Sequence, residues 1–319
     1  MIKLVSYNFV VFFVIANVFY WGIPVVGTIS DWIKGKPEST SEYRSFVGWR
    51  QAQRHTVNAT ADAKQKVYFF GGSTMFGLGV SDAEIIPSLV SAATGVQAEN
   101  YGNIGYTSHQ GLVLLIELLQ AGHRPDVVIF YDGVNDVAVK CEKGMTPTSH
   151  GEEKNLTSLV RGRDSPNTLT YYFRPVLRLT ERIGREVSNT ASINRYDCDA
   201  DSKKAEQIAE NLLQDWRFAK LLTESFGGKF IGILQPVSFF SRTRLDKIKE
   251  PQPFLDRQYQ AVYPKLRQEI ARNSGFHDLV PVLDVDEPVF TDFNHLTAAG
   301  NTYVARGVAE ILQRTVAQR

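Results

Sequence analysis

The sequence has only two cysteines among its 319 residues, and no Cys/His spacing in it is typical of a structural zinc site. A disulfide-rich scaffold is therefore excluded. The chain also has almost no excess of either charge, with 35 Lys and Arg residues against 34 Asp and Glu residues. This balance argues against a nucleic-acid-binding surface, which needs a clear basic excess. Its 43% hydrophobic and 22% charged residues are typical of a globular protein, not of a disordered, collagenous or polytopic membrane chain.

The first thirty residues contain very little charge. No charged side chain occurs between Lys3 and Asp31, and twelve Phe, Val or Ile residues lie within Tyr7–Gly27. About 20 apolar residues are enough to span a bilayer, and no A-x-A-like cleavage site follows the run. We therefore expect residues 1–30 to form an uncleaved transmembrane signal-anchor, with a cleaved signal peptide and a helix buried in the protein as the alternatives.

The rest of the chain divides into a tether and a body. Residues 31–65 combine Pro, Ser, Thr and mixed charge, which predicts a tether leading to a body at 66–319. Within the body, the polar stretch 140–201 is interpreted as an insertion. A bridge between Cys141 and Cys198 would need an oxidising compartment, whereas two unrelated reduced thiols fit the sequence equally well. We therefore expect a single-pass membrane protein whose body lies outside the cytoplasm, in the periplasm.

The body alternates short apolar runs with longer helical segments. We expect five strands, at Val67–Phe70, Val96–Tyr101, Val127–Tyr131, Phe230–Leu234 and Leu279–Val285. We expect helices between them, at Thr107–Ala121, Lys203–Ser225, Leu255–Asn273 and Thr297–Val316. Such alternation builds βαβ units and a parallel sheet covered on both faces. Because such sheets bind ligands beyond the carboxyl ends of their strands, every strand-end loop is a candidate site.

The first two strands are each followed by a block of polar and glycine residues. Gly71-Gly72-Ser73-Thr74 can project a nucleophilic serine from a tight strand-to-helix turn, although most serines in this setting only make a turn. A phosphate loop does not fit, because Leu78 and Gly79 stand where it needs Lys and Ser/Thr. In the second block, residues 100–107, a glycine can aim its backbone N–H into the site. Helix capping by Thr107 is the alternative.

The other two blocks supply an amide, a carboxylate and an imidazole. Asp132-Gly133-Val134-Asn135-Asp136 closes the third strand, and the Asn135 amide can donate a hydrogen bond to a developing oxyanion. A plain turn is the alternative. In Asp292-Phe293-Asn294-His295, the carboxylate stands three residues before the imidazole and can orient it through Nδ1–H. None of the other five histidines has an equally complete setting.

Taken together and in this order, the four blocks resemble the signature blocks of the SGNH (GDSL-type) hydrolase family. The resemblance covers about Lys66–Val316 without the insertion. It implies a flavodoxin-like, three-layer α/β/α fold whose five parallel strands have the order 2-1-3-4-5. The family's first block commonly reads Gly-Asp-Ser-Leu, so this chain departs from the pattern by having Gly72 in place of the acidic residue.

The resemblance also implies a role for particular residues. It makes Ser73 the nucleophile and Asp292 and His295 its partners in a catalytic triad. It assigns the oxyanion hole to Ser73, Gly105 and Asn135. No metal or organic cofactor is implied.

The activity expected from this resemblance is hydrolysis of an acyl ester. The membrane anchor suggests a cell-envelope ester, such as an O-acetyl or short-chain acyl group on a polysaccharide, or a lipid. One alternative is an O-acyltransferase that passes the same acyl group to a glycan hydroxyl, since acceptor choice depends on pocket shape. Another is a non-catalytic glycan-binding or assembly protein on the same fold. The acyl group, the alcohol and the oligomeric state stay open.

Overall fold

The computed structural model describes residues 42–44, 48–59, 63, 65–151, 153, 195–248 and 252–317. The expected anchor at 1–30 and most of the expected insertion lie outside these ranges. Among the residues that are described, no helix combines the length and the apolar composition needed to cross a membrane.

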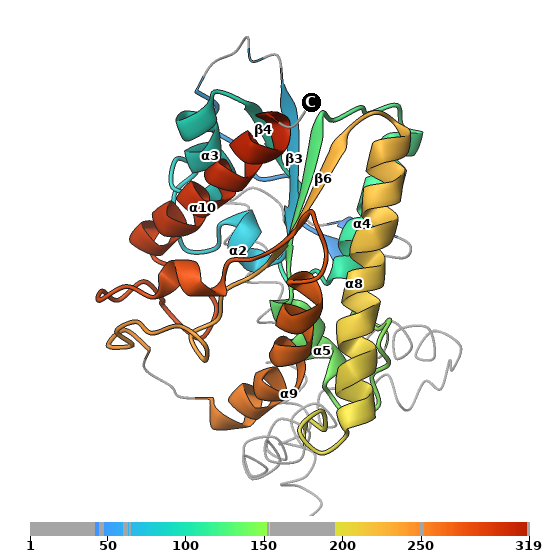
Figure 1. Ribbon diagram of the computed structural model, residues 1–319, viewed down its shortest axis with the longest axis vertical. Helices are drawn as coiled ribbons and strands as arrows, with labels where there is room; N and C mark the ends of the chain where they lie inside the picture. Colours follow the sequence, from blue (N-terminus) through green and yellow to red (C-terminus); the bar gives the residue numbers. More distant parts are fainter. Residues whose placement is uncertain are drawn as a thin grey trace, which may run out of the picture. The chain divides into compact units, whose positions relative to one another are not determined.

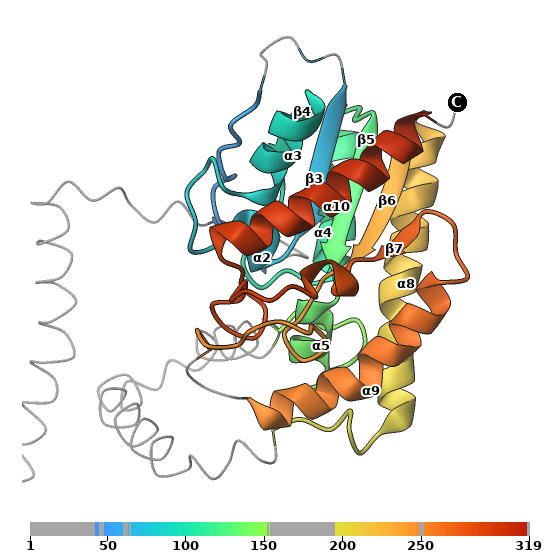
Figure 2. The ribbon, with the colours of Figure 1, turned by 60° about the vertical axis from the view of Figure 1, so that its left-hand side comes forward.

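The centre of the described body is a parallel sheet. It consists of β3 (Lys66–Gly71), β4 (Gln97–Asn100), β5 (Val127–Asp132), β6 (Lys229–Leu234) and β7 (Phe276–Asp278). The strands lie side by side in the order β4-β3-β5-β6-β7 and all their pairings are parallel (Figure 2). In chain order this arrangement is 2-1-3-4-5, so the predicted fold class is confirmed.

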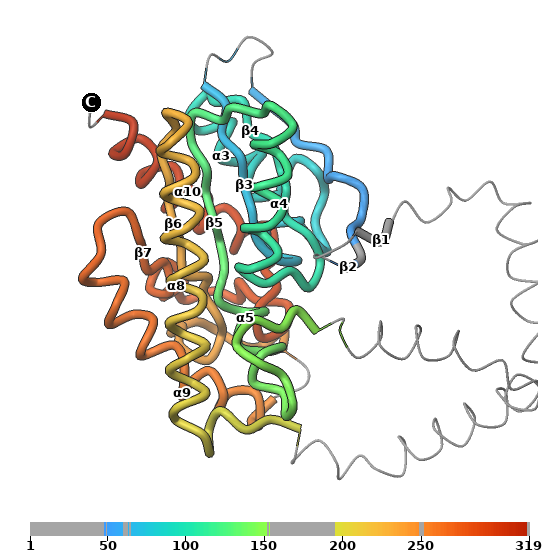
Figure 3. Tube along the Cα trace, turned by 90° about the vertical axis from the view of Figure 1, so that its right-hand side faces the viewer, coloured from blue at the N-terminus to red at the C-terminus, as the bar shows by residue number. Residues whose placement is uncertain are grey.

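Helices cover both faces of the sheet (Figures 1 and 3). One face packs against α4 (Ser108–Gln120), α8 (Ser202–Ser225) and α9 (Pro253–Ile270). The other packs against α3 (Ile86–Thr94) and α10 (Ala298–Ala317), which lie beside each other in Figure 2. The helix bounds agree with the four predicted helices to within a few residues, whereas α3 was not predicted.

Side-chain alternation along the central strands explains this three-layer packing. On β3, Tyr68 and Phe70 contact the layer of α4 and α8, whereas Val67 and Phe69 contact the layer of α3 and α10. All four side chains are buried. A strand that is buried on both faces needs apolar residues at successive positions, and this is the signal that identified it in the sequence.

The prediction of the fifth strand was wrong. The strand is β7 (Phe276–Asp278), and the predicted run Leu279–Val285 instead contains a 3₁₀ helix at Val280–Leu283. The backbone N–H of Val280 donates to Oδ1 of Asp278 over 2.9 Å, and the next residue, Pro281, has no N–H to offer a neighbouring strand. The run is therefore apolar because it packs under α10, not because it extends the sheet.

Part of the expected tether lies against the body. It includes a two-stranded hairpin of β1 (Glu42–Arg44) and β2 (Gly48–Arg50). Farther along, the Asn58 side chain accepts a hydrogen bond from the N–H of Ala98 (2.7 Å) and donates one to its carbonyl (3.2 Å). Ala98 belongs to the edge strand β4, so Asn58 occupies backbone groups that a further strand would otherwise use.

The two cysteines, Cys141 and Cys198, form a disulfide, which decides the alternative that the sequence left open. Both are buried. The bridge closes a loop that contains most of the expected insertion and joins the end of α5 (Val134–Lys140) to the segment before α8. On the chain-entropy model, closing a loop of this length stabilises the fold by about 4 kcal/mol.

Candidate active site

Ser73 begins the short helix α2 (Ser73–Phe76), directly after β3. Two glycines make this turn possible. Gly71 has φ +154, and a Cβ there would lie 2.5 Å from the carbonyl oxygen of Tyr131. A Cβ at Gly72 would overlap Nδ2 of Asn135. The absence of a side chain at position 72 thus leaves room for the Asn135 amide.

The structure brings the predicted Ser73, His295 and Asp292 side chains into one relay. Oγ of Ser73 lies 2.7 Å from Nε2 of His295, and Nδ1 of the same ring lies 2.6 Å from Oδ2 of Asp292. A carboxylate can only accept, so Nδ1 carries a proton and Nε2 is the ring nitrogen that can take the serine proton. These residues come from opposite ends of the body, 222 positions apart for serine and histidine.

The loop before α10 holds Asp292 in its charged form. Its Oδ1 accepts hydrogen bonds from the backbone N–H groups of His295 (2.7 Å) and Asn294 (2.9 Å). Partial burial acts to raise the pKa of Asp292, but the hydrogen bonds from His295 and Asn294 outweigh it and hold the pKa below its ordinary value. Asp292 is therefore charged at neutral pH and available to stabilise an imidazolium.

Asn135 lies beside the serine turn, on the first turn of α5. Its Nδ2 donates to the carbonyl of Tyr106 over 2.8 Å, and this carbonyl is its one hydrogen-bond acceptor within the described ranges. A side-chain amide has two N–H groups, so a second one is left for a ligand. Gly105 precedes Tyr106 in a left-handed turn, with φ +80. The structure thus places the second and third blocks in contact through Asn135, next to the serine turn.

A buried charge cluster joins the third block to the start of α4, directly after the second block. It was not predicted from the sequence. The Asp136 carboxylate accepts from Nζ of Lys140 (2.7 Å), and both side chains are essentially inaccessible to solvent. It also accepts from Oγ of Ser108 (2.7 Å) and lies 3.2 Å from the Ser108 N–H at the start of α4. The i, i+4 spacing of Asp136 and Lys140 was the available sequence signal.

Two further polar residues lie near the relay. Thr74 was part of the first block but had no role assigned to it, and Gln235 was missed. Thr74 and Gln235 are both buried, and Nε2 of Gln235 donates to Oγ1 of Thr74 over 2.8 Å. Gln235 directly follows β6. Applying the strand-end rule to the fourth strand, as to the others, would have identified it.

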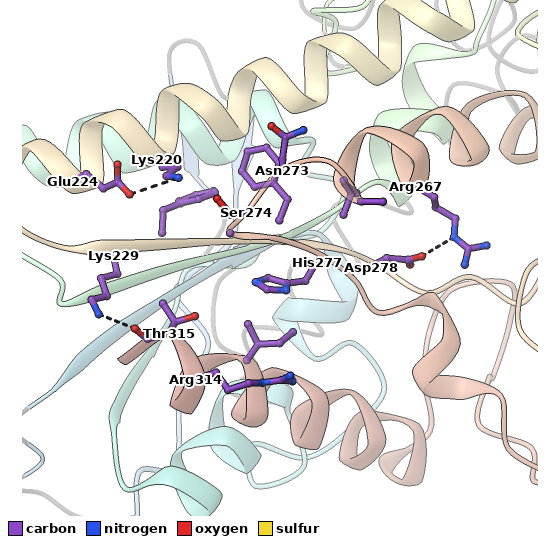
Figure 4. A pocket seen from close by; sticks show the side chains of 16 residues that line it. Lys220, Glu224, Lys229, Arg267, Asn273, Ser274, His277, Asp278, Arg314 and Thr315 are labelled. Carbon is purple, nitrogen blue, oxygen red and sulfur yellow. Dashed lines mark hydrogen bonds and ion pairs between the residues drawn. The ribbon is translucent and has the colours of Figure 1, made fainter. Parts of the chain in front are cut away.

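One cavity of about 770 Å³ lies away from these residues, along the edge strand β7 (Figure 4). None of the four blocks lines it. Two of its basic side chains have structural partners: Lys229 donates to the Thr315 carbonyl over 2.7 Å, and Arg267 pairs with Asp278 at 2.6 Å. The C-terminal ends of α8, α9 and α10 lie here, and in the last turns of α9 and α10 the basic side chains of Arg267 and Arg314 complement the helix dipoles. We therefore assign these basic residues a structural role.

The described residues contain no group of three or more His, Cys, Asp or Glu side chains placed to hold a metal ion. Comparisons of the sequence with models of protein families and with curated proteins found no match.

Among solved structures, the chain is similar to a member of the lipolytic protein G-D-S-L family from Veillonella parvula. The two are 13% identical with a TM-score of 0.44, over 78% of this chain and 99% of that one. The chain is also similar to Est24, a carbohydrate acetylesterase from Sinorhizobium meliloti, at 13% identity and a TM-score of 0.42, over 79% and 99% of the two chains. At such values, function has to be argued from the side chains of this chain.

Proposed function

We propose that this protein is a serine esterase in which Ser73, His295 and Asp292 act as a catalytic triad. The observation that carries the proposal is the unbroken relay from the Ser73 hydroxyl through the His295 ring to the Asp292 carboxylate, with distances of 2.7 and 2.6 Å. This is the geometry that acyl transfer through a serine requires.

The reaction begins when Oγ of Ser73 attacks the ester carbonyl carbon and its proton passes to Nε2 of His295. Asp292 stabilises the imidazolium through Nδ1–H. The tetrahedral intermediate collapses, the ester C–O bond breaks, and the leaving alcohol takes the proton from Nε2. Water then attacks the acyl-enzyme with His295 as the base, which releases the acid and restores the serine.

The oxyanion of each tetrahedral intermediate is stabilised by three donors. They are the backbone N–H groups of Ser73 and Gly105 and the second N–H of the Asn135 amide. The contact of Asn135 with the Tyr106 carbonyl and its closeness to Gly72 support this assignment. A single donor of this kind is typically worth about 10²- to 10³-fold in rate.

The substrate belongs to the cell envelope in this proposal. Residues 1–30 anchor the enzyme in a membrane, and the body lies on the periplasmic side. The uncharged run between Lys3 and Asp31 supports the anchor, and the Cys141–Cys198 bridge supports an oxidising compartment. An O-acetyl or short-chain acyl ester on an envelope glycan or lipid fits this location.

The test is hydrolysis of p-nitrophenyl acetate by the wild type and by Ser73→Ala, with circular dichroism to confirm that both are folded. We expect turnover to fall to background in the variant. Turnover equal to that of the wild type would overturn the proposal. Addition of a glycan acceptor then separates hydrolysis from acyl transfer, because a transferase would form acylated glycan at the expense of free acid.

A further inference from the structure

The hydroxyl of Thr74 connects the turn that carries Ser73 with the loop that carries His295. Its Oγ1 lies 3.3 Å from the carbonyl oxygen of Asn294 and 2.8 Å from Nε2 of Gln235. A carbonyl can only accept a hydrogen bond, so the Thr74 proton points to Asn294 and the hydroxyl accepts from the Gln235 amide. Both hydrogen-bonding directions of Thr74 are thereby fixed.

Gln235 is itself held at two backbone atoms. Its N–H donates to the carbonyl of Asp132, at the end of β5, over 2.8 Å. Its carbonyl accepts from the hydroxyl of Tyr263 on α9 over 3.0 Å. Gln235 is 3% exposed and Thr74 4% exposed, so water does not compete for this contact. These two backbone hydrogen bonds attach the residue that carries the amide donor to the end of β5 and to α9.

The carbonyl of Asn294 accepts the hydrogen bond from Thr74. Asn294 stands between Phe293 and His295, is buried, and donates its own N–H to Oδ1 of Asp292. A hydrogen bond to its carbonyl therefore fixes the peptide that directly precedes the histidine. The path from β6 through Gln235, Thr74 and Asn294 joins the sheet to both ends of the serine–histidine contact.

We propose that Thr74 and Gln235 are positioning residues that set the separation between Oγ of Ser73 and Nε2 of His295. The inference rests on the proposed esterase function. Neither side chain touches the reacting atoms. Loss of the Thr74 hydroxyl leaves two buried groups without their partner, and the histidine loop shifts relative to the serine. Misplacement of reacting groups by about 1 Å can cost about 10²-fold in rate.

Two variants separate the hydroxyl from the packing at position 74. Thr74→Val keeps the shape and removes the hydroxyl, whereas Thr74→Ser keeps the hydroxyl and removes the methyl group. For p-nitrophenyl acetate, measured well below each variant's Tm, we expect kcat to fall about 10- to 100-fold in Thr74→Val with KM within about twofold of wild type. In Thr74→Ser we expect kcat to stay within about threefold of the wild type.

Two further variants, Gln235→Met and its combination with Thr74→Val, test the whole hydrogen-bonded path and not only Thr74. Gln235→Met removes the amide and should lower kcat as Thr74→Val does. The double variant should be no worse than the more affected single variant by more than about threefold, because residues of one network are not additive. Independent, multiplying losses would contradict a shared path.

The outcomes distinguish this inference from the function on which it rests. If Ser73→Ala is inactive while Thr74→Val keeps the wild-type kcat, the positioning role is wrong and the esterase proposal stands. The same conclusion follows if Thr74→Ser loses as much kcat as Thr74→Val, since packing would then explain both. If Ser73→Ala keeps wild-type turnover, the proposed function itself fails.

Discussion

Substitution of Gly72 by alanine should disturb the proposed oxyanion hole without removing any of its groups. The backbone of Gly72 is extended, with φ −84, so alanine does not have to adopt the left-handed conformation that favours glycine. The new Cβ would overlap Nδ2 of Asn135, and ordinary contact requires the amide to retreat by about 1 Å. Such a retreat also strains the 2.8 Å hydrogen bond from Asn135 to the Tyr106 carbonyl.

A displacement of about 1 Å in a catalytic donor predicts a fall in kcat of about 10²-fold, similar to the loss expected for Asn135→Ala. The assay is p-nitrophenyl acetate hydrolysis by Gly72→Ala, Asn135→Ala and the double variant. Because both single changes act on the same donor, the double variant should be about as active as either one.

Gly111→Ala is the matched control. It adds the same methyl group inside α4, where the nearest neighbours of the Cβ would be the Phe130 ring, at 3.3 Å, and Phe70 instead of the Asn135 amide. Its kcat should stay within about twofold of wild type, since helix interiors favour alanine over glycine. Wild-type kcat in Gly72→Ala would refute the reasoning, and so would multiplying losses in the double variant with Asn135→Ala.

The remaining predictions concern stability. Lys140→Met leaves the buried Asp136 carboxylate without its cation and should lower the free energy of unfolding in urea by about 3–5 kcal/mol; a loss below about 1 kcal/mol would contradict this. The lowered pKa of Asp292 stabilises the fold above its ordinary pKa of about 3.9, and this contribution is lost as the pH falls through the lowered value. The Tm of Asp292→Asn should therefore be below that of the wild type at pH 7, with a gap that narrows below about pH 4. A gap unchanged down to pH 3 would argue against it.

The sheet could be predicted from the sequence because its central strands are buried on both faces. Runs such as Val127–Tyr131 contain no polar residue, and a continuous apolar run is what a parallel, doubly covered strand requires. The same rule failed at Leu279–Val285, where a mostly apolar run, interrupted by Pro281 and Asp284, packs under a helix instead of pairing. Periodicity reports burial, and burial alone does not distinguish a strand from a 3₁₀ turn.

The site was predictable only as far as its residues follow strand ends. Ser73 and Asn135 stand there, and their types suggest their chemistry. The Asp292–His295 pair instead lies in the loop between the 3₁₀ helix and α10, and only its residue types and spacing pointed to it. Thr74 and Gln235 are ordinary residue types whose contact spans 161 positions. Their relation arises only when the chain folds.

The central claim is that Ser73 is the activated nucleophile, and covalent labelling tests it most directly. The folded protein is treated with a fluorophosphonate, digested, and its peptides are analysed by mass spectrometry. The account predicts one adduct, on the peptide that contains Ser73, with labelling lost in Ser73→Ala and strongly slowed in His295→Ala. An enzyme that hydrolyses the ester while the label is found on another residue, or on none, would contradict it.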